Sequence, residues 1–191
     1  MNIVIKGLTP LLMNRDSIMF DDSVEPRNTK TETYPQFEER IWRQKAHTND
    51  EGVIIFPAIW LRKALIASQG LNANPIKPPN ARRASATLKQ NFVSGIMIMD
   101  NYPIIGTKGK PITIDDLVPH KCMVSPQKGK VLCIRPQILL PWSVDIVLEI
   151  SDLAISEQNV LECLRWVGRY NGVGDWRPQK GGMFGGFEIK N

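Results

Sequence analysis

The chain has 191 residues, a formal net charge of +5, 42% hydrophobic residues and 23% charged residues. This length and composition predict one globular domain, with or without a large insertion, that can bury a core without covalent staples. The positive charge is too small for a histone-like polycation. It favours an acidic partner such as nucleic acid, although many basic proteins bind none.

The first predicted element is a strand at the N-terminus. Ile3 and Ile5 alternate with their neighbours, and Gly7 ends the strand. The stretch 14–50 is polar with little periodicity, so we expect a long excursion there, with one short helix near 37–45.

A short strand and a helix come next. Residues 53–56 form an apolar strand, and Pro57 is well suited to the first helical position. The helix is expected to run to Gly70, with Leu61 and Leu65 on its buried face.

The middle of the chain has weaker signals. We expect a short basic helix over 81–90, a strand over 92–99, and the next strand over 102–105 across a tight turn. Residues 107–130 contain several Gly, Pro and Lys residues, which predicts a second excursion.

The last third carries the clearest periodicity. Residues 131–134 and 137–140 predict two short strands, and strict alternation over 142–150 predicts a longer one. Ser156 is a suitable N-cap for a helix to residue 170, with a core-facing stripe formed by Val160, Leu164 and Val167.

These elements, with a closing strand over 184–189, read strand, helix, strand, strand, helix, strand. This order is the split βαβ, or ferredoxin-like (RRM-like), arrangement: an α+β fold with an antiparallel sheet and both helices on one face. We therefore predict a single domain over 1–191 with insertions at about 14–50 and 71–130. The opposite sheet face is left for a ligand, but the fold alone does not decide function.

The cysteines and the apolar runs indicate in which cellular compartment the protein resides. Cys122, Cys133 and Cys163 are odd in number and widely spaced, which predicts neither a disulfide framework nor a zinc site and favours a reducing, cytoplasmic setting. The first residues do not have the pattern of a signal peptide, and the apolar runs are too short to span a bilayer.

The segment 171–186, NGVGDWRPQKGGMFGG, contains six glycines. Glycines let the backbone approach a ligand closely, and successive free N–H groups can bind an anion. Arg177 and Lys180 can reach phosphate, and Trp176 offers a stacking platform. The alternative is a glycine-rich turn with Trp176 in the core.

Four segments in this order resemble the RAMP superfamily, whose members form backbone and processing subunits of CRISPR effector complexes. They are IVIKGLTPLLMNR, VIIFPAIWLRKAL, IRPQILLPWSVDIVLEI and VGRYNGVGDWRPQKGGMFGGFEI. The run GDWRPQKGGMFGGF also looks like stand-alone members carried by phages. The resemblance implies a backbone subunit that binds single-stranded RNA or DNA and oligomerises along the strand. Because the sequence has no HExxH, Walker or GxSxG motif, we predict a non-catalytic protein without cofactor or metal, and we expect no membrane partner.

The resemblance places two residues of the 57–70 helix, Arg62 and Lys63, against the nucleic-acid backbone. Arg82, Arg83 and Lys89 form a second basic cluster, which is either a clamp over the strand or a solvated loop. The predicted contact residues are Asn14, Arg15, Arg62, Lys63, Arg82, Arg83, Lys89, Trp176, Arg177, Lys180, Gly181, Gly182 and Phe184.

Two other functions stay open. The first is a RAMP-type endoribonuclease that uses His120, or Asp21 and Asp22 with a divalent metal. The second is a phage protein-interaction module that engages a host complex.

Overall fold

The computed structural model describes residues 1–15, 21–70, 73, 75–78, 82, 86–98, 101–125 and 129–190. The α-helices are α1 (Tyr34–Ile41), α2 (Ala58–Ser68), α3 (Lys89–Gly95) and α4 (Glu157–Trp166). The strands are β1 (Asn2–Gly7), β2 (Leu11–Leu12), β3 (Ile55–Phe56), β4 (Ile96–Met97), β5 (Tyr102–Pro103), β6 (Val118–Val124), β7 (Val131–Ile138), β8 (Ser143–Val147), β9 (Glu149–Ile150) and β10 (Phe187–Lys190). Short helical turns are η2 (Trp42–Lys45), η3 (Thr107–Gly109), η4 (Ile114–Asp116), the π-helical η5 (Val167–Asn171) and η6 (Pro178–Lys180).

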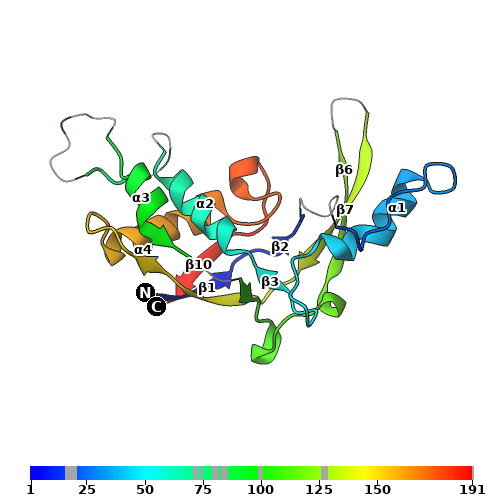
Figure 1. Cartoon of the computed structure of the whole chain (residues 1–191), viewed down its shortest axis with the longest axis horizontal. Helices are drawn as coiled ribbons and strands as arrows, with labels where there is room; N and C mark the ends of the chain where they lie inside the picture. The colour runs from blue at the N-terminus through cyan, green and yellow to red at the C-terminus, as the bar shows by residue number, and fades with distance from the viewer. Residues whose placement is uncertain are drawn as a thin grey trace.

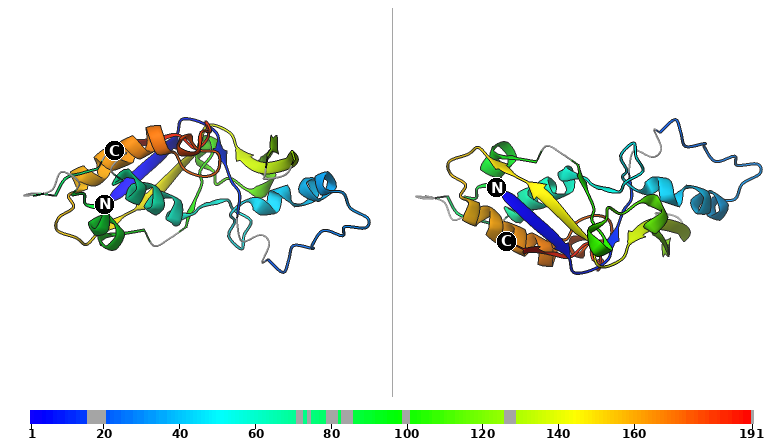
Figure 2. Two further views of the ribbon diagram at one scale, coloured as in Figure 1. Left: turned by 90° about the horizontal axis from the view of Figure 1, so that it is seen from above. Right: turned by 90° about the horizontal axis from the view of Figure 1, so that it is seen from below.

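One antiparallel sheet has the order β10–β1–β8. Alternation places Ile3 and Ile5 of β1 on its buried face, opposite Ile146 and Val144 of β8. Helices α2 and α4 cover this face, as Figures 1 and 2 show. The expected α+β class, with antiparallel strands, is therefore observed.

Helices α2 and α4 form where the sequence predicts them. Leu61 and Leu65 of α2 are almost fully buried, and the α4 stripe of Val160, Leu164 and Val167 is fully buried. The Ser156 hydroxyl accepts a hydrogen bond from the Asn159 amide at 3.1 Å, which caps α4. In the described part of the chain, no helix is both long and apolar enough to cross a bilayer.

The middle of the chain departs from the prediction. Residues 92–95 belong to helix α3, and only Ile96 and Met97 form a strand, β4, which pairs with β9. At the end of this helix Gly95 lies against Asp152, where an added Cβ would be 2.3 Å from the Asp152 Cβ. Strand β5 pairs with β3 and not with β4, so the expected 92–105 hairpin is wrong. Of the expected 81–90 helix, α3 includes only Lys89 and Gln90, and residues 81 and 83–85 lie outside the described part.

A second sheet has the order β2–β7–β6. The expected excursion over 107–130 therefore contains a strand, β6, and the two strands expected around residue 135 are one strand, β7. Pro136 does not break β7 because it pairs directly with Pro119 of β6. The two residues that lack an N–H are therefore opposite each other in the ladder.

The expected 14–50 excursion is partly anchored to this second sheet. Helix α1 and η2 lie against β7, and Figure 1 shows them beside the β6–β7 hairpin. Lys45 Nζ donates to Glu38 Oε2 at 2.5 Å and to the Ile134 carbonyl at 3.0 Å, while the Ile134 amide donates to the same carboxylate oxygen at 2.8 Å. Both charged side chains are buried.

Candidate nucleic-acid interface

The segment 171–186 leaves α4 through η5 and returns to the first sheet as β10. Its glycines are needed for this path. Gly174 has φ +76°, and a Cβ there would lie 2.5 Å from the Leu12 carbonyl oxygen. Gly185 has φ +70°, and a Cβ there would overlap the Val173 carbonyl. The loop therefore folds on itself and on the β1–β2 connection more closely than other residues allow.

The amide groups of this loop are largely used inside the protein. The Gly181 amide donates to Pro178, and the Gly182 amide donates to Arg177 at 3.1 Å. The Val173 amide donates to Gly185 at 2.9 Å. The expectation of an anion-binding nest of free N–H groups is therefore wrong for these positions, and their glycines shape the loop.

A hollow of about 400 Å³ lies between α2 and this loop. Four predicted contact residues line it: Asn14 after β2, Lys63 on α2, and Arg177 and Lys180 on the loop. Because α2 lies on the helix-covered side of the sheet, the hollow opens on that side. The expectation that a ligand would use the opposite sheet face is not what this geometry favours.

The charge in the hollow is positive. Three cations face one acidic residue, Asp175, and Asp175 also forms an ion pair with Arg135. Arg135 is only 8% exposed. Burial is the largest single effect and lowers the pKa of Arg135, but the charge of Asp175, together with Cys133, Cys122 and the hydrogen bond to Asp175, raises this pKa above its ordinary value. Because Arg135 already pairs with Asp175, the positive charges of Lys63, Arg177 and Lys180 are not cancelled by this carboxylate.

Arg177 is held in place by its own loop. Its Nη1 donates to the Gly174 carbonyl at 3.0 Å, and its Nε donates to Gln179 Oε1 at 3.2 Å. Lys63 and Lys180 are exposed. The hollow thus combines one oriented guanidinium with two solvated ammonium groups.

An aromatic cluster lies where the loop meets the β6–β7 hairpin. The His120 ring is 5.8 Å from the Trp176 ring and 5.0 Å from the Phe184 ring, both edge-to-face. The Arg135 guanidinium lies 5.0 Å from the Trp176 ring centre. Trp176 has φ +48°, an unfavourable backbone conformation that the Phe184 amide supports by donating to its carbonyl at 3.1 Å.

The environment of His120 keeps its imidazole neutral near pH 7. Burial, and then the charge of Arg135, lower the pKa of His120 from its ordinary value. His120 therefore packs as an uncharged ring between two aromatic side chains.

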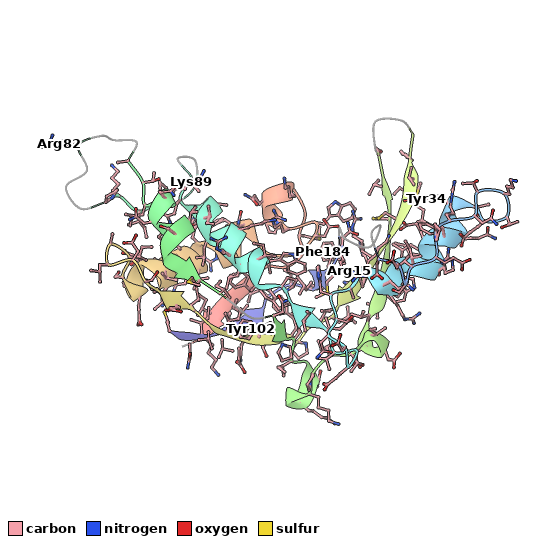
Figure 3. All side chains as sticks on the ribbon, viewed as in Figure 1. Arg15, Tyr34, Arg82, Lys89, Tyr102 and Phe184 are labelled. Carbon is pink, nitrogen blue, oxygen red and sulfur yellow. The ribbon has the colours of Figure 1, made fainter. Side chains whose placement is uncertain are left out.

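The other predicted contact residues lie apart from the hollow. Arg62 Nη2 donates to the Val93 carbonyl at 2.7 Å, so it ties α2 to α3. Arg15 forms an ion pair with Asp21. Figure 3 shows Arg82 and Lys89 at the end of the molecule farthest from Tyr34, with Phe184 and Arg15 between these ends. Arg83 lies outside the described residues.

Of the two acidic residues considered for metal binding, Asp21 already pairs with Ser23 and Arg15. The Ser23 hydroxyl, and then Arg15, lower the pKa of Asp21 to about 2, while Asp22 is exposed. Within the described ranges, no group of three or more His, Cys, Asp and Glu side chains is placed to hold a metal ion.

Among the other residues that line the hollow are Trp60 and Asn171, which the sequence analysis did not name as contact residues. Trp60 precedes Lys63 by one helical turn, so the i, i+3 spacing on α2 was the available signal. Asn171 ends the turn that follows α4, and no pattern in the sequence marks it as a site residue.

No protein-family model matches the chain, and no curated protein matches it. Cmr6 from Pyrococcus furiosus is a similar solved structure, with 8% identity, a TM-score of 0.43, and coverage of 100% of this chain and 97% of that chain. A Cas6 product complex is similar with 13% identity and a TM-score of 0.36, over 99% of this chain and 50% of that chain. The chain thus spans half the length of that Cas6 chain. Both TM-scores are low, so the fold rests on the strand pairing described above.

Proposed function

We propose that this protein binds single-stranded RNA or DNA at the hollow between α2 and the loop 171–186. The convergence of Lys63 with Arg177 and Lys180 carries the proposal, because these cations come from separate parts of the chain. Cations along a groove neutralise phosphates, and they supply most of the affinity for a single strand.

Aromatic side chains beside the hollow support the same function. Trp176 and Phe184 belong to the loop whose other residues line the hollow, and His120 packs against both rings. Bases of any sequence stack on such rings. In this proposal His120 supports the aromatic cluster, and the protein binds its strand without cutting it.

We propose that the fold is a ferredoxin-like core of the RAMP type. The elements β1, α2, β4, β8 with β9, α4 and β10 follow the order βαββαβ. The pairing of β4 with β9 supports this, since β9 follows β8 after the single residue Leu148 and places β4 beyond β8. Of the remaining strands, β5 and β6 lie within the expected 71–130 insertion, and this order also takes β4 from that stretch into the core.

We also propose that several copies line up along one strand. The part of the molecule made of α1 and the β6–β7 hairpin extends away from the β10–β1–β8 sheet in Figure 1, which suits contact with a neighbouring copy. The resemblance of the four sequence segments to RAMP backbone subunits supports the same arrangement.

The test is a mobility-shift titration with single-stranded RNA and DNA over a range of salt concentrations. Removing one phosphate contact on a single strand lowers the slope of log affinity against log salt by roughly 0.7. We expect this change for Lys63→Ala and for Lys180→Ala. Lys190→Ala is the matched control, because Lys190 lies exposed on β10 outside the hollow. Failure of the wild-type protein to bind either strand at low salt would refute the proposal.

A cleavage assay separates binding from catalysis. Labelled RNA is expected to stay intact with the wild-type protein, with or without divalent metal. Cleavage that disappears in His120→Ala would instead establish an endoribonuclease.

A further inference from the structure

The hollow contains two amide side chains that have no partner in the described part of the chain. Asn171 is only 2% exposed and lines the hollow, yet its side chain makes no hydrogen bond to a described residue. Asn14, which lines the hollow after the end of β2, is partly buried, and its side chain also makes no hydrogen bond to a described residue. The amide atoms of Asn171 are not sealed from the hollow, so a ligand there can reach them and supply the pairing that buried polar groups normally have.

An aromatic side chain forms another wall of the same hollow. Trp60 is half-buried, and its ring is fixed by edge-to-face contacts with His47 at 5.3 Å and Phe56 at 5.7 Å. Gly174 brings the loop close to this ring, since a Cβ there would lie 3.6 Å from Trp60 Cζ3. The ring is therefore held rigidly at the boundary of the hollow.

These groups match the base and the phosphate of a nucleotide. A rigid aromatic ring suits a base, amides suit the hydrogen-bonding edge of a base, and the ammonium groups of Lys63 and Lys180 suit phosphate. The volume of about 400 Å³ lies within the range of small-molecule sites, near its lower end. A longer stretch of strand has no room inside the hollow, while one nucleotide does.

We propose that the hollow admits one nucleotide of the bound strand, with its base against Trp60 and its polar edge on Asn14 and Asn171. The identity of the strand rests on the proposed function, but the recognition of a single nucleotide does not. A carboxamide offers two donors and one acceptor, so it can pair with the Watson–Crick edge of every base. The site therefore selects an unpaired nucleotide and not a particular base.

The first experiment titrates each of the four nucleoside 5′-monophosphates into the full chain and follows tryptophan fluorescence. We expect saturable quenching that is lost in Trp60→Phe. Ribose 5-phosphate, which has no base, is expected to bind at least tenfold more weakly. Equal binding of ribose 5-phosphate and the nucleotides would show a phosphate site only and would overturn the proposal.

The second experiment compares variants of the two amides. Asn14→Ala is expected to weaken nucleotide binding about fivefold to tenfold, as loss of one hydrogen bond does. Asn171→Ser is expected to do the same, and its thermal unfolding is measured first because Asn171 is buried. Asn14 is only partly buried, so Asn14→Ala keeps the test valid if Asn171→Ser unfolds. Asn2→Ala is the matched control, since Asn2 is exposed on β1.

A strand that carries an abasic backbone distinguishes this proposal from the proposed function. Asn14→Ala is expected to weaken binding of a normal strand and to leave binding of an abasic strand unchanged. Strand binding that the amide variants do not alter, together with no binding of mononucleotides, would overturn the nucleotide site and leave the proposed function intact. Mononucleotide binding without strand binding would overturn the proposed function and leave the nucleotide site intact. The absence of both kinds of binding would overturn both proposals.

Discussion

The guanidinium of Arg135 on β7 lies 5.0 Å from the ring centre of Trp176, and the same side chain forms an ion pair with Asp175. One buried arginine of the second sheet therefore contacts two consecutive residues of the loop that borders the hollow. This contact fixes the loop relative to the β6–β7 hairpin, and several expectations follow from it and from its surroundings.

Replacing Arg135 is expected to destabilise the protein and loosen the loop. Arg135→Leu leaves the partly buried Asp175 without its partner, and we expect a loss of about 1–3 kcal/mol in the free energy of unfolding, below the cost for a fully buried pair. Urea denaturation followed by tryptophan fluorescence measures this loss. Arg165→Leu, on the exposed face of α4, is the control and should change stability little. A similar effect of both variants would contradict the role of Arg135.

The Glu38–Lys45 pair is expected to be more costly to break. Both side chains are buried, and they also hold the backbone amide and carbonyl of Ile134. Lys45→Met leaves a carboxylate buried beside β7, for which about 3–5 kcal/mol is typical. Denaturant unfolding is the measurement, with Lys30→Met at an exposed position as the control. A loss below about 1 kcal/mol would show that the carboxylate finds another partner or is solvated in the variant.

His120 is expected to titrate below its ordinary pKa of 6.5. The folded protein resists protonation of this imidazole more than the unfolded chain does. Its contribution to stability is therefore complete above about pH 6.5 and is lost progressively as the pH falls below that value. NMR titration of the histidine ring protons measures the pKa directly. A pKa at or above 6.5 for His120 would contradict the aromatic packing described here.

The same residue predicts a pH-dependent difference between variants. His120→Phe removes the titrating group, so its stability between about pH 5 and 7 should change less with pH than that of the wild-type protein. The comparison requires denaturation curves at each pH. Parallel pH profiles of the two proteins would show that His120 contributes nothing to the dependence.

Phe184 is expected to contribute to strand binding through stacking and not through charge. Phe184→Ala should weaken binding of single strands by the equivalent of about 1–3 kcal/mol per stacked base, while the salt dependence stays as in the wild type. Tyr170→Ala, an exposed aromatic residue outside the loop, is the control. Binding titrations at two salt concentrations provide both quantities. If Phe184→Ala changes the salt dependence of strand binding but leaves the affinity for the strand unchanged, stacking on Phe184 is contradicted.

Local sequence patterns predicted the elements that face the main core. The α4 stripe and the Ser156 cap are local signals, and the structure contains both. Strand β6 was missed because VPHKCMV mixes Pro, His and Lys, and its pairing with β7 is a tertiary contact. The partner of β5 was wrong for the same reason: alternation identifies a strand but not its neighbour.

The candidate site was predicted in part. Asn14, Lys63, Arg177 and Lys180 were named from the sequence, and the fold brings them to one hollow. Trp60 and Asn171 were missed, because their importance depends on which segments pack together and not on their immediate neighbours. Arg62 was named for its charge, although packing directs it to the Val93 carbonyl.

The glycines of the loop have a consequence for how this protein can change. A side chain at Gly182 would overlap the Trp176 backbone, and one at Gly185 would overlap Val173, so these positions tolerate little variation. Gln179 and Lys180 sit on the exposed turn η6 of the same loop, where many side chains fit. The path of the loop and the proposed ligand contact at Lys180 are thus encoded by separate residues. If the proposed binding holds, mutations in η6 are expected to change what the hollow binds while the architecture around it stays constant.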